Sequence, residues 1–320
     1  MKENNWGKPQ TTRSRVALEI ASHMVGASDQ KYRQAKVLLR SHGADEWPVC
    51  LFGSSTIEGI EAVARREATM AIVNPSAMLT LAARGTGPFS TPLPLRAIAV
   101  IPTFDQFVFA VNADTGLRAF EDIAASRLPL RIALRGQADH SLNHMLNDIV
   151  AAAGFSLADL ISWGGAAIQE GIIPYPDGPK FQAFRDGRFN AIFDEGAESW
   201  VNEAIDAGMT ILPLAETTLR ALEALGYRRG MLTRAKYPGL PMDTPTVDFS
   251  GWTIFVHAEA LDDLARQICE GLLARRGLIP WDGEGELPVG RMCLDAPDTP
   301  MDVPLHPAAE RFWRERGFLK

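Results

Sequence analysis

The sequence has little cysteine, no long apolar run and no surplus of positive charge. Of its 320 residues only three are cysteines, Cys50, Cys269 and Cys293, and no two are close enough for a CxxC pair. This sparse, odd set excludes a disulfide framework and predicts free thiols. Lys plus Arg number 32 against 39 Asp plus Glu, a formal net charge of −7. Because a polyanion needs a concentrated basic surface, we expect no nucleic-acid partner.

Export and membrane signals are also missing from the sequence. No segment is apolar over the ~20 residues that a membrane-spanning helix needs. The first residues, MKENNWGKPQTTRSR, are polar and charged and lack the apolar core of a secretory signal. We therefore expect a cytoplasmic protein unless a signal has been removed. The hydrophobic fraction of 46% is that of an ordinary globular protein, and the length predicts about two domains.

Several enzyme motifs are absent: GxSxG, GxxxxGK[ST], HExxH, and GxGxxG after a strand. One spacing suggests a metal site, because His140 and His144 share a face of a predicted helix that Asp148 extends. Zinc needs a third or fourth suitable ligand, and none lies nearby in the sequence. We predict an ordinary polar helix face there, and neither a metal nor a cofactor.

Short β-rich stretches alternate with helical stretches, which predicts an α/β fold with mostly parallel sheets. Strands are predicted at 16–22, 48–53, 69–74, 95–102, 106–112, 129–136, 189–196, 209–215 and 251–261. Helices are predicted at 28–44 (with Ser28 or Asp29 as cap and Gly43 near its end), 54–67, 75–85, 137–154, 181–188, 197–208, 262–277 and 307–317.

This order of segments predicts two doubly wound α/β lobes with a hinge and a cleft between them. One lobe comprises residues 1–111 and 250–320, and the other comprises residues 112–249. The chain would cross between the lobes near 111–114 and near 246–251. Since strand and helix ends converge at such a cleft, ligand-binding residues are expected there.

Two polar turns follow predicted strands of the first lobe. GSST at 53–56 opens a helix whose N–H groups attract an anion, although helix capping by Ser54 or Ser55 explains the serines equally well. Asn74 offers donors and an acceptor, and it is alternatively a turn residue before Pro75.

The segment TFDQF at 103–107 lies near the expected cleft, between two strands that we assign to the first lobe. Phe104 and Gln106 are placed there to line a ligand. Aromatic residues such as Phe104 and Trp252 are nevertheless found more often in a core than in a pocket.

The second lobe has a corresponding turn, RGQADHS at 135–141. The charged fork of Arg135 suits a carboxylate or phosphate, and Gln137, His140 and Ser141 surround the helix start. The alternative is an exposed arginine beside a capped helix.

Asp194 and Glu195 end a later strand of the second lobe. They predict one end of the ligand site, where the carboxylates would bind an ammonium or hydroxyl group of the ligand. A favourable interaction with a helix dipole explains them as well.

Several segments together resemble one family. The tail PLHPAAERFWRERG at 304–317 resembles the ending of the TAXI family of solute receptors from tripartite (TRAP-type) transport systems. Four further segments are similar to the family in their order: 53–85, 95–102, 117–141 and 186–196. The sequence departs from the family in its start, MKENNW, where an export signal is usual, and in RGQADHS, where a longer Gly-Ser stretch is usual.

The resemblance implies the type II periplasmic-binding-protein fold, the periplasmic location usual in the family, and membrane permease subunits as partners. It also carries over cleft residues by position: Ser54, Ser55, Thr56, Asn74, Ser76, Gln137, Ser141, Asp194 and Glu195.

Three functions remain open. In a binding module, two lobes would close on a carboxylate-containing organic acid or amino-acid-like ligand, with Arg135 and two helix N-termini at the anionic end and Asp194 or Glu195 at the other. A cytoplasmic enzyme on this fold, decarboxylase-like or cofactor-biosynthetic, would use His23, His140 or Glu195 in acid–base chemistry. A cytoplasmic sensor is the third. We favour binding over catalysis, since the sequence supplies polar cleft residues and no organised nucleophile or metal set.

Overall fold

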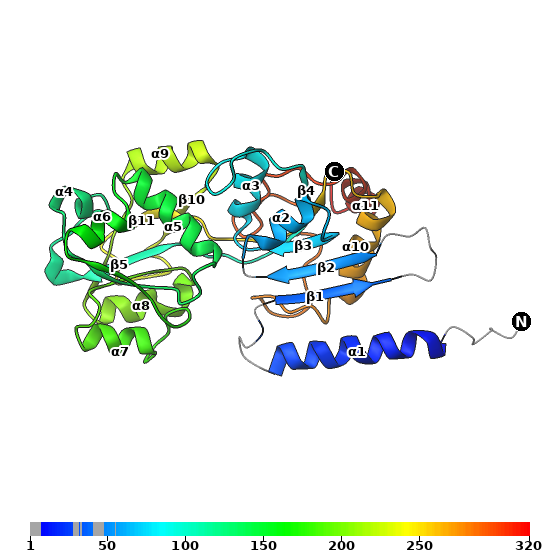
Figure 1. Ribbon diagram of the computed structural model, residues 1–320, viewed down its shortest axis with the longest axis horizontal. Coiled ribbons are helices and arrows are strands. Elements are labelled where there is room, and N and C mark those ends of the chain that lie inside the picture. Colours follow the sequence, from blue (N-terminus) through cyan, green and yellow to red (C-terminus); the bar gives the residue numbers. More distant parts are fainter. Residues whose placement is uncertain (1–7, 28–31, 33, 41–47, 55) are drawn as a thin grey trace, which may run out of the picture.

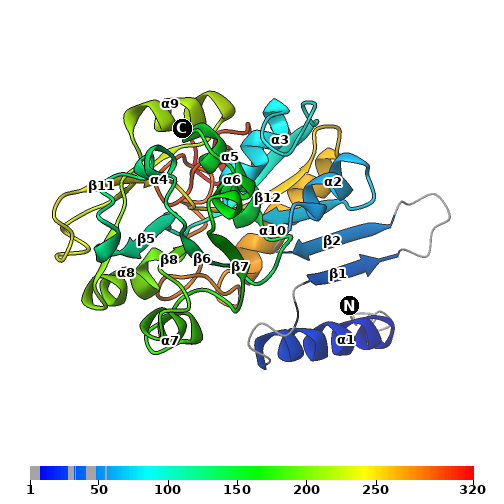
Figure 2. The ribbon, with the colours of Figure 1, turned by 60° about the vertical axis from the view of Figure 1, so that its left-hand side comes forward.

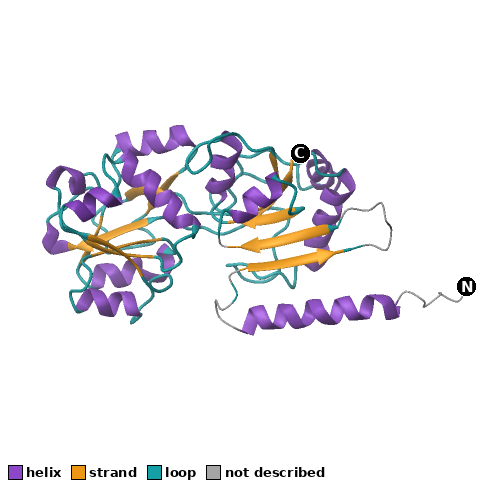
Figure 3. Ribbon diagram, viewed as in Figure 1, coloured by secondary structure: helices purple, strands orange, loops and turns teal. Residues whose placement is uncertain are grey.

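Two five-stranded sheets lie side by side in the computed structural model, with helices on both faces of each (Figures 1 and 3). The structure describes residues 8–27, 32, 34–40, 48–54 and 56–320. The first sheet has the strand order β1-β2-β3-β12-β4, and the second has the order β7-β6-β8-β5-β9. The predicted α/β class with two sheets is confirmed.

The first sheet is sandwiched between two helix pairs. Its strands are β1 (Gln34–Leu39), β2 (Val49–Ser54), β3 (Met70–Val73), β4 (Leu95–Ile101) and β12 (Trp252–His257). Side chains such as Phe255 pack on one face with α2 (Glu58–Ala64) and α3 (Ser76–Arg84). The alternate side chains of β12, Ile254 and Val256, pack on the other face with α10 (Asp262–Arg275) and α11 (Pro307–Glu315). This alternation is what a strand buried on both faces requires.

The helix of the chain's tail is held in this core. Pro307 occupies the first turn of α11, and the side chain of His306 caps it by accepting from the N–H of Ala308. Phe312 and Trp313 are fully buried, and Trp313 Nε1 donates to the carbonyl of Ile98, 2.9 Å away. The tail helix therefore stabilises the first sheet by packing on the face opposite α2 and α3.

The second sheet comprises β5 (Val108–Asn112), β6 (Arg131–Leu134), β7 (Ala166–Gln169), β8 (Ala191–Asp194) and β9 (Met209–Ile211). The 3-10 turn η2 (Ala113–Thr115) follows β5. One face packs with α4 (Asp122–Ser126), α5 (Ser141–Ala152), α6 (Leu157–Ser162) and α9 (Glu216–Leu225). The other face packs with α7 (Pro179–Arg185) and α8 (Ala197–Asp206). A separate pair, β10 (Arg229–Leu232) and β11 (Thr244–Val247), precedes the return to the first sheet.

Two segments cross between the sheets, and they run side by side. Residues 102–107 lead from β4 to β5, and residues 248–251 lead from β11 to β12. The N–H of Phe249 donates to the carbonyl of Asp105 at 2.9 Å, and the N–H of Gly251 donates to that of Thr103 at 3.1 Å. The second crossing falls where the sequence placed it, near 246–251. The first crossing comes earlier than the expected 111–114, because β5 belongs to the second sheet.

The first two predicted elements are wrong. Residues 16–22, predicted as a strand, belong to the helix α1 (Lys8–Ala27), which lies alongside β1 in both views (Figures 1 and 2). Within 28–44, predicted as a helix, residues 34–39 form β1, and Ser28, Asp29 and Gly43 lie outside the described residues. Pairing decides this segment, since β1 forms an antiparallel ladder with β2 from Gln34↔Ser54 to Leu39↔Val49.

The sheets are mixed rather than mostly parallel. Only β2–β3, β6–β7 and β6–β8 pair in parallel among the strands of the two large sheets. The other predicted strands and helices are present, with ends that differ by a few residues, while α4, α6, α9, β7, β10 and β11 were not predicted. Of the helices that the structure describes, none combines the length and apolar character needed to cross a membrane.

Candidate functional site

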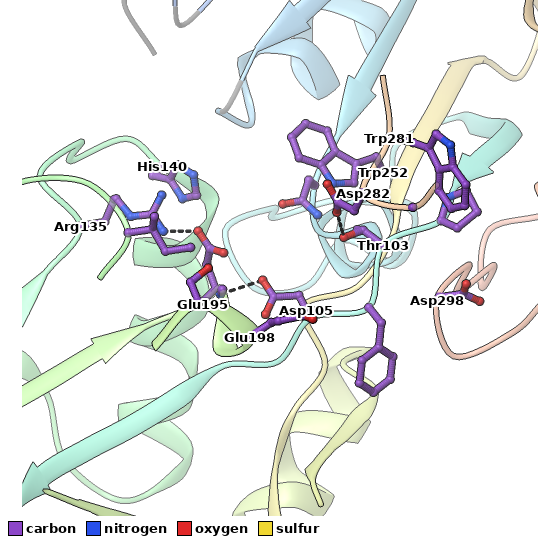
Figure 4. A pocket seen from close by; sticks show the side chains of 17 residues that line it. Thr103, Asp105, Arg135, His140, Glu195, Glu198, Trp252, Trp281, Asp282 and Asp298 are labelled. Atoms are coloured by element: carbon purple, nitrogen blue, oxygen red, sulfur yellow. Dashed lines mark hydrogen bonds and ion pairs between the residues drawn. The ribbon is translucent and has the colours of Figure 1, made fainter. Parts of the chain in front are cut away.

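A cavity of about 650 Å³ opens where the two crossings meet both sheets (Figure 4). Arg135, His140 and Glu195 lie on one side of it, and Thr103, Trp252, Trp281 and Asp282 lie on the other. The described lining residues are Asn74, Pro102, Thr103, Phe104, Asp105, Arg135, His140, Ile173, Glu195, Gly196, Glu198, Ser199, Trp252, Trp281, Asp282, Gly283 and Asp298.

Five of the predicted site residues line this cavity: Asn74, Phe104, Arg135, His140 and Glu195. The structure therefore brings together residues from the ends of β3, β6 and β8 with the first crossing. Asn74 Nδ2 also donates to the carbonyl of Gly251 at 3.2 Å, which ties the end of β3 to the second crossing. His140 caps α5 by accepting the N–H of Leu142 at its Nδ1, 3.2 Å away.

Ser54 and Thr56 of the predicted GSST turn are absent from the described wall of the cavity. Ser54 Oγ and Thr56 Oγ1 are 3.0 Å apart, and Thr56 Oγ1 accepts the N–H of Glu58. Ser55 lies outside the described residues. The backbone of Thr56 pairs with that of His140, so this turn contacts the start of α5, a helix that packs on the second sheet.

Five other predicted residues are absent from the described wall of the cavity: Ser76, Gln106, Gln137, Ser141 and Asp194. Ser76 is buried with its Oγ 2.6 Å from Thr253 Oγ1. Ser141 is fully buried, and its hydroxyl has no hydrogen-bond partner within the described part of the chain. Of the acid–base candidates, His23 lies exposed on α1, outside the described wall.

Gln106 instead forms part of a buried network at the crossings. Its Nε2 donates to Asp248 Oδ1 at 3.0 Å, and its Oε1 accepts the N–H of Met231 at 2.9 Å. Ser250 Oγ donates to the same Asp248 oxygen at 2.6 Å. Burial raises the pKa of Asp248 to about 6, although these hydrogen bonds act in the opposite direction. The network fixes the two crossings against each other.

Arg135 pairs with two of the protein's own carboxylates. Its Nη2 lies 2.7 Å from Asp194 Oδ1 and also pairs with Glu195 Oε1. Asp194 is completely buried, and its second oxygen accepts from Lys180 Nζ at 2.5 Å. Burial by itself would lower the pKa of Arg135, but the two carboxylates raise it. Burial lowers the pKa of Lys180 against the attraction of Asp194. The cluster holds two cations and two anions, and Asp194 is a structural centre rather than a residue of the cavity wall.

The start of α8 is occupied by a carboxylate of the chain itself. Asp105 Oδ2 accepts the N–H of Gly196 at 2.8 Å, and Oδ1 accepts that of Ala197 at 2.9 Å. Burial and the neighbouring Glu195 carboxylate raise the pKa of Asp105 well above its usual range, while the N–H donors lower it. This helix N-terminus is therefore already capped.

Sequence reasoning did not assign a ligand role to Asp105, Trp252, Trp281 or Asp282. Trp252, expected in the core, is 45% exposed, and Phe104 is 46% exposed. Asp105 lies in the same TFDQF segment as Phe104, which the sequence analysis placed near the cleft, so its position in the sequence could have indicated a place at the cavity. Trp281 and Asp282 lie in a glycine-rich loop after α10, and only the fold brings that loop to the cavity.

The described wall of the cavity is strongly acidic. Five carboxylates line it, against one guanidinium, that of Arg135: they are Asp105, Glu195, Glu198, Asp282 and Asp298. Within the described ranges no group of three or more His, Cys, Asp or Glu side chains is arranged to hold a metal ion. Three of these carboxylates are already ion-paired: Glu195 with Arg135, Glu198 with Lys236, and Asp298 with Arg291. The raised pKa of Asp105 favours its neutral form. Asp282 is therefore the lining carboxylate that has no basic partner among the described residues, and it would attract a positively charged group.

Comparison with known proteins gives a family and a set of distant structures. Residues 53–317 match the NMT1-like family. The alkanesulfonate-binding protein SsuA from Xanthomonas axonopodis pv. citri, solved with MOPS, is 17% identical over 68% of this chain, with a TM-score of 0.33. The chain spans 59% of the length of that protein.

Two further solved structures are similarly distant. A periplasmic transporter is 14% identical over 81% of this chain and 77% of its own, with a TM-score of 0.34. The substrate-binding protein of an amino acid ABC transporter is 15% identical over 67% and 69%, with a TM-score of 0.28. Likeness at this level leaves the ligand to be argued from this chain's own residues.

Proposed function

Because the chain belongs to the NMT1-like family, we propose that it is a solute-binding protein whose two halves close on a small molecule. One half comprises the described residues up to 107 together with 248–320, and the other comprises residues 108–247. The expected boundary at 111 is moved because β5 pairs within the second sheet. One observation carries the proposal: a cavity of about 650 Å³ is lined from both halves, at the place where both crossings run.

Closure would be a hinge motion about the paired crossings. Residues 103–107 and 247–251 are joined by backbone hydrogen bonds, and Gln106, Asp248 and Ser250 hold them together. Affinity in such a protein comes from contacts made with both halves at once. Asn74, Phe104, Arg135, His140 and Glu195 are the predicted residues that we propose as ligand contacts.

We further propose that the chain is a TAXI-type receptor of a tripartite transport system, or a relative without a signal, that works with membrane permease subunits. The support is the resemblance of the tail at 304–317, which forms the buried α11. Genomic neighbours that encode permease subunits would strengthen this assignment, and neighbours of an unrelated enzymatic kind would weaken it.

Of the two ligand classes expected, the acidic wall favours an amino-acid-like solute over a simple organic acid. A dicarboxylate would meet the carboxylate of Asp282, which has no basic partner among the described residues, and a guanidinium that already pairs with Asp194 and Glu195. A solute that carries an ammonium group beside its carboxylate would be attracted by the same wall carboxylate that repels a simple organic acid.

The test is a thermal-shift screen of the full chain against carboxylates, amino acids and aromatic acids, followed by small-angle X-ray scattering. A true ligand raises the melting temperature, because it binds only the native state, and reduces the radius of gyration. Binding without compaction would contradict closure. Recovery of the ligand in a chemically changed form would favour the enzyme instead.

A further inference from the structure

Two lining residues of the cavity already hold an ammonium group of the protein, that of Lys236. Lys236 Nζ lies 3.1 Å from Glu198 Oε2 and 5.5 Å from the ring centroid of Phe104. Both partners line the cavity. A carboxylate and an aromatic face therefore share one cation of the protein at the rim, which is a combination that stabilises positive charge through ion pairing and cation–π attraction.

A second carboxylate–aromatic set lies on the other wall. Trp252 and Trp281 line both the main cavity and a side pocket of about 270 Å³, together with Asp282. Pro102 and Pro280 complete the apolar part of this side pocket. Figure 4 shows the two tryptophans and Asp282 across the cavity from Arg135 and Glu195.

The three side chains are held in place. Asp282 Oδ2 accepts the hydroxyl of Thr103, and Trp281 Nε1 donates to the carbonyl of Gly285 at 3.2 Å. A Cβ at Gly283 would come within 2.1 Å of the Trp281 ring, so the loop needs glycine where the ring lies over it. Trp252 begins β12, and its position is fixed by pairing with Ile101 of β4.

No lysine or arginine of the described chain forms an ion pair with Asp282, in contrast to Glu198. Two positive groups at the cavity are already engaged, since Asp105 caps the N-terminus of α8 and Arg135 pairs with Asp194 and Glu195. Trp252, Trp281 and Asp282 thus form a carboxylate–aromatic set like the one that holds Lys236. The carboxylate of Asp282 faces the cavity without a basic partner among the described residues.

We propose that the ligand carries a protonated or alkylated amine, and that Trp252, Trp281 and Asp282 hold this organic cation. The inference rests on the proposed solute-binding function and names the chemical class of its ligand. The ring faces and the carboxylate would replace the hydration shell of the amine, as in other sites for alkylated ammonium groups.

The test is isothermal titration calorimetry of the full chain with two matched pairs of probes. Choline is compared with 3,3-dimethyl-1-butanol, and n-pentylamine with 1-pentanol, so that one member of each pair carries a cationic group and the other does not. We expect at least one cation to bind about tenfold or more tightly than its neutral counterpart. Trp252→Ala and Asp282→Asn should each remove most of this preference.

Two control variants separate the site from a general effect. Trp252→Phe keeps an aromatic face and should keep most of the preference, and Asp263→Asn removes an exposed carboxylate at the start of α10, outside the cavity wall. Neutral partners that bind as well as the cations, or cation binding that survives both Trp252→Ala and Asp282→Asn, would overturn the inference while leaving solute binding intact. Failure of both cations to bind at millimolar concentration would also overturn it, and the broader screen would then judge solute binding separately.

Discussion

The carboxylate of Asp105 accepts a hydrogen bond of 2.8 Å from the backbone N–H of Gly196, 91 residues away in sequence. Asp105 belongs to the segment that crosses between the sheets, and Gly196 begins the turn into α8. The bond therefore fastens the crossing to the second sheet's side of the cavity. It also fills a helix N-terminus that a ligand anion would otherwise use.

Replacing Asp105 with Ala should lower the free energy of unfolding by about 1–3 kcal/mol, because the N–H groups of Gly196 and Ala197 lose their acceptor. Asp105→Asn keeps one acceptor oxygen and should cost less. Urea unfolding followed by circular dichroism measures both, with Asp114→Ala on an exposed turn as the control. An alanine variant as stable as the Asn variant would show that the cap contributes little.

Arg135→Ala should destabilise the protein strongly, by about 3–5 kcal/mol, because it leaves the fully buried Asp194 with Lys180 as its remaining charged partner. The melting temperature of the ligand-free protein measures this loss. Arg131→Ala, on the same strand but with an exposed side chain that binds two backbone carbonyls, should cost much less. A stable Arg135→Ala protein with weakened ligand binding would instead make Arg135 mainly a ligand residue.

Asp248 should make stability depend on pH between about 4 and 6. Its pKa is about 6 in the native state against an ordinary value of 3.8, so the native state binds more protons than the unfolded state in this range. The free energy of unfolding should therefore fall as the pH rises through this window. Asp248→Asn keeps an acceptor for Gln106 and Ser250 and should flatten that slope in chemical denaturation at several pH values. An unchanged slope would place the titration elsewhere.

Gly196→Ala should cost more stability than Gly208→Ala. Both glycines have a positive φ, +72° and +84°, so alanine is strained at either position. Only at Gly196 would the new Cβ come within 1.7 Å of Ile173 Cδ1, which itself lines the cavity. We expect an additional loss of about 1 kcal/mol or more from this overpacking, measured by urea unfolding, and a weaker ligand affinity. Equal losses would mean that Ile173 moves aside freely.

The site was predictable where a residue's place follows from the strand before it. Asn74, Arg135 and Glu195 come at or near the ends of β3, β6 and β8, and a strand's end can be located from local pattern. The same pattern could not distinguish a ligand contact from a cap or a buried bond, as Ser76 and Gln106 show. Arg135 lines the cavity, but the pairing of its guanidinium with Asp194 and Glu195 depends on how two strands lie together.

The α/β class, the alternation of most central strands and helices, and the acidic character of the chain follow from local periodicity and composition, so they were predictable without the structure. The tertiary structure decided where the chain changes sheets, that 34–39 is a strand, and that the loop of Trp281 and Asp282 reaches the cavity. Each of these depends on contacts between residues far apart in sequence, whose energies no local pattern contains.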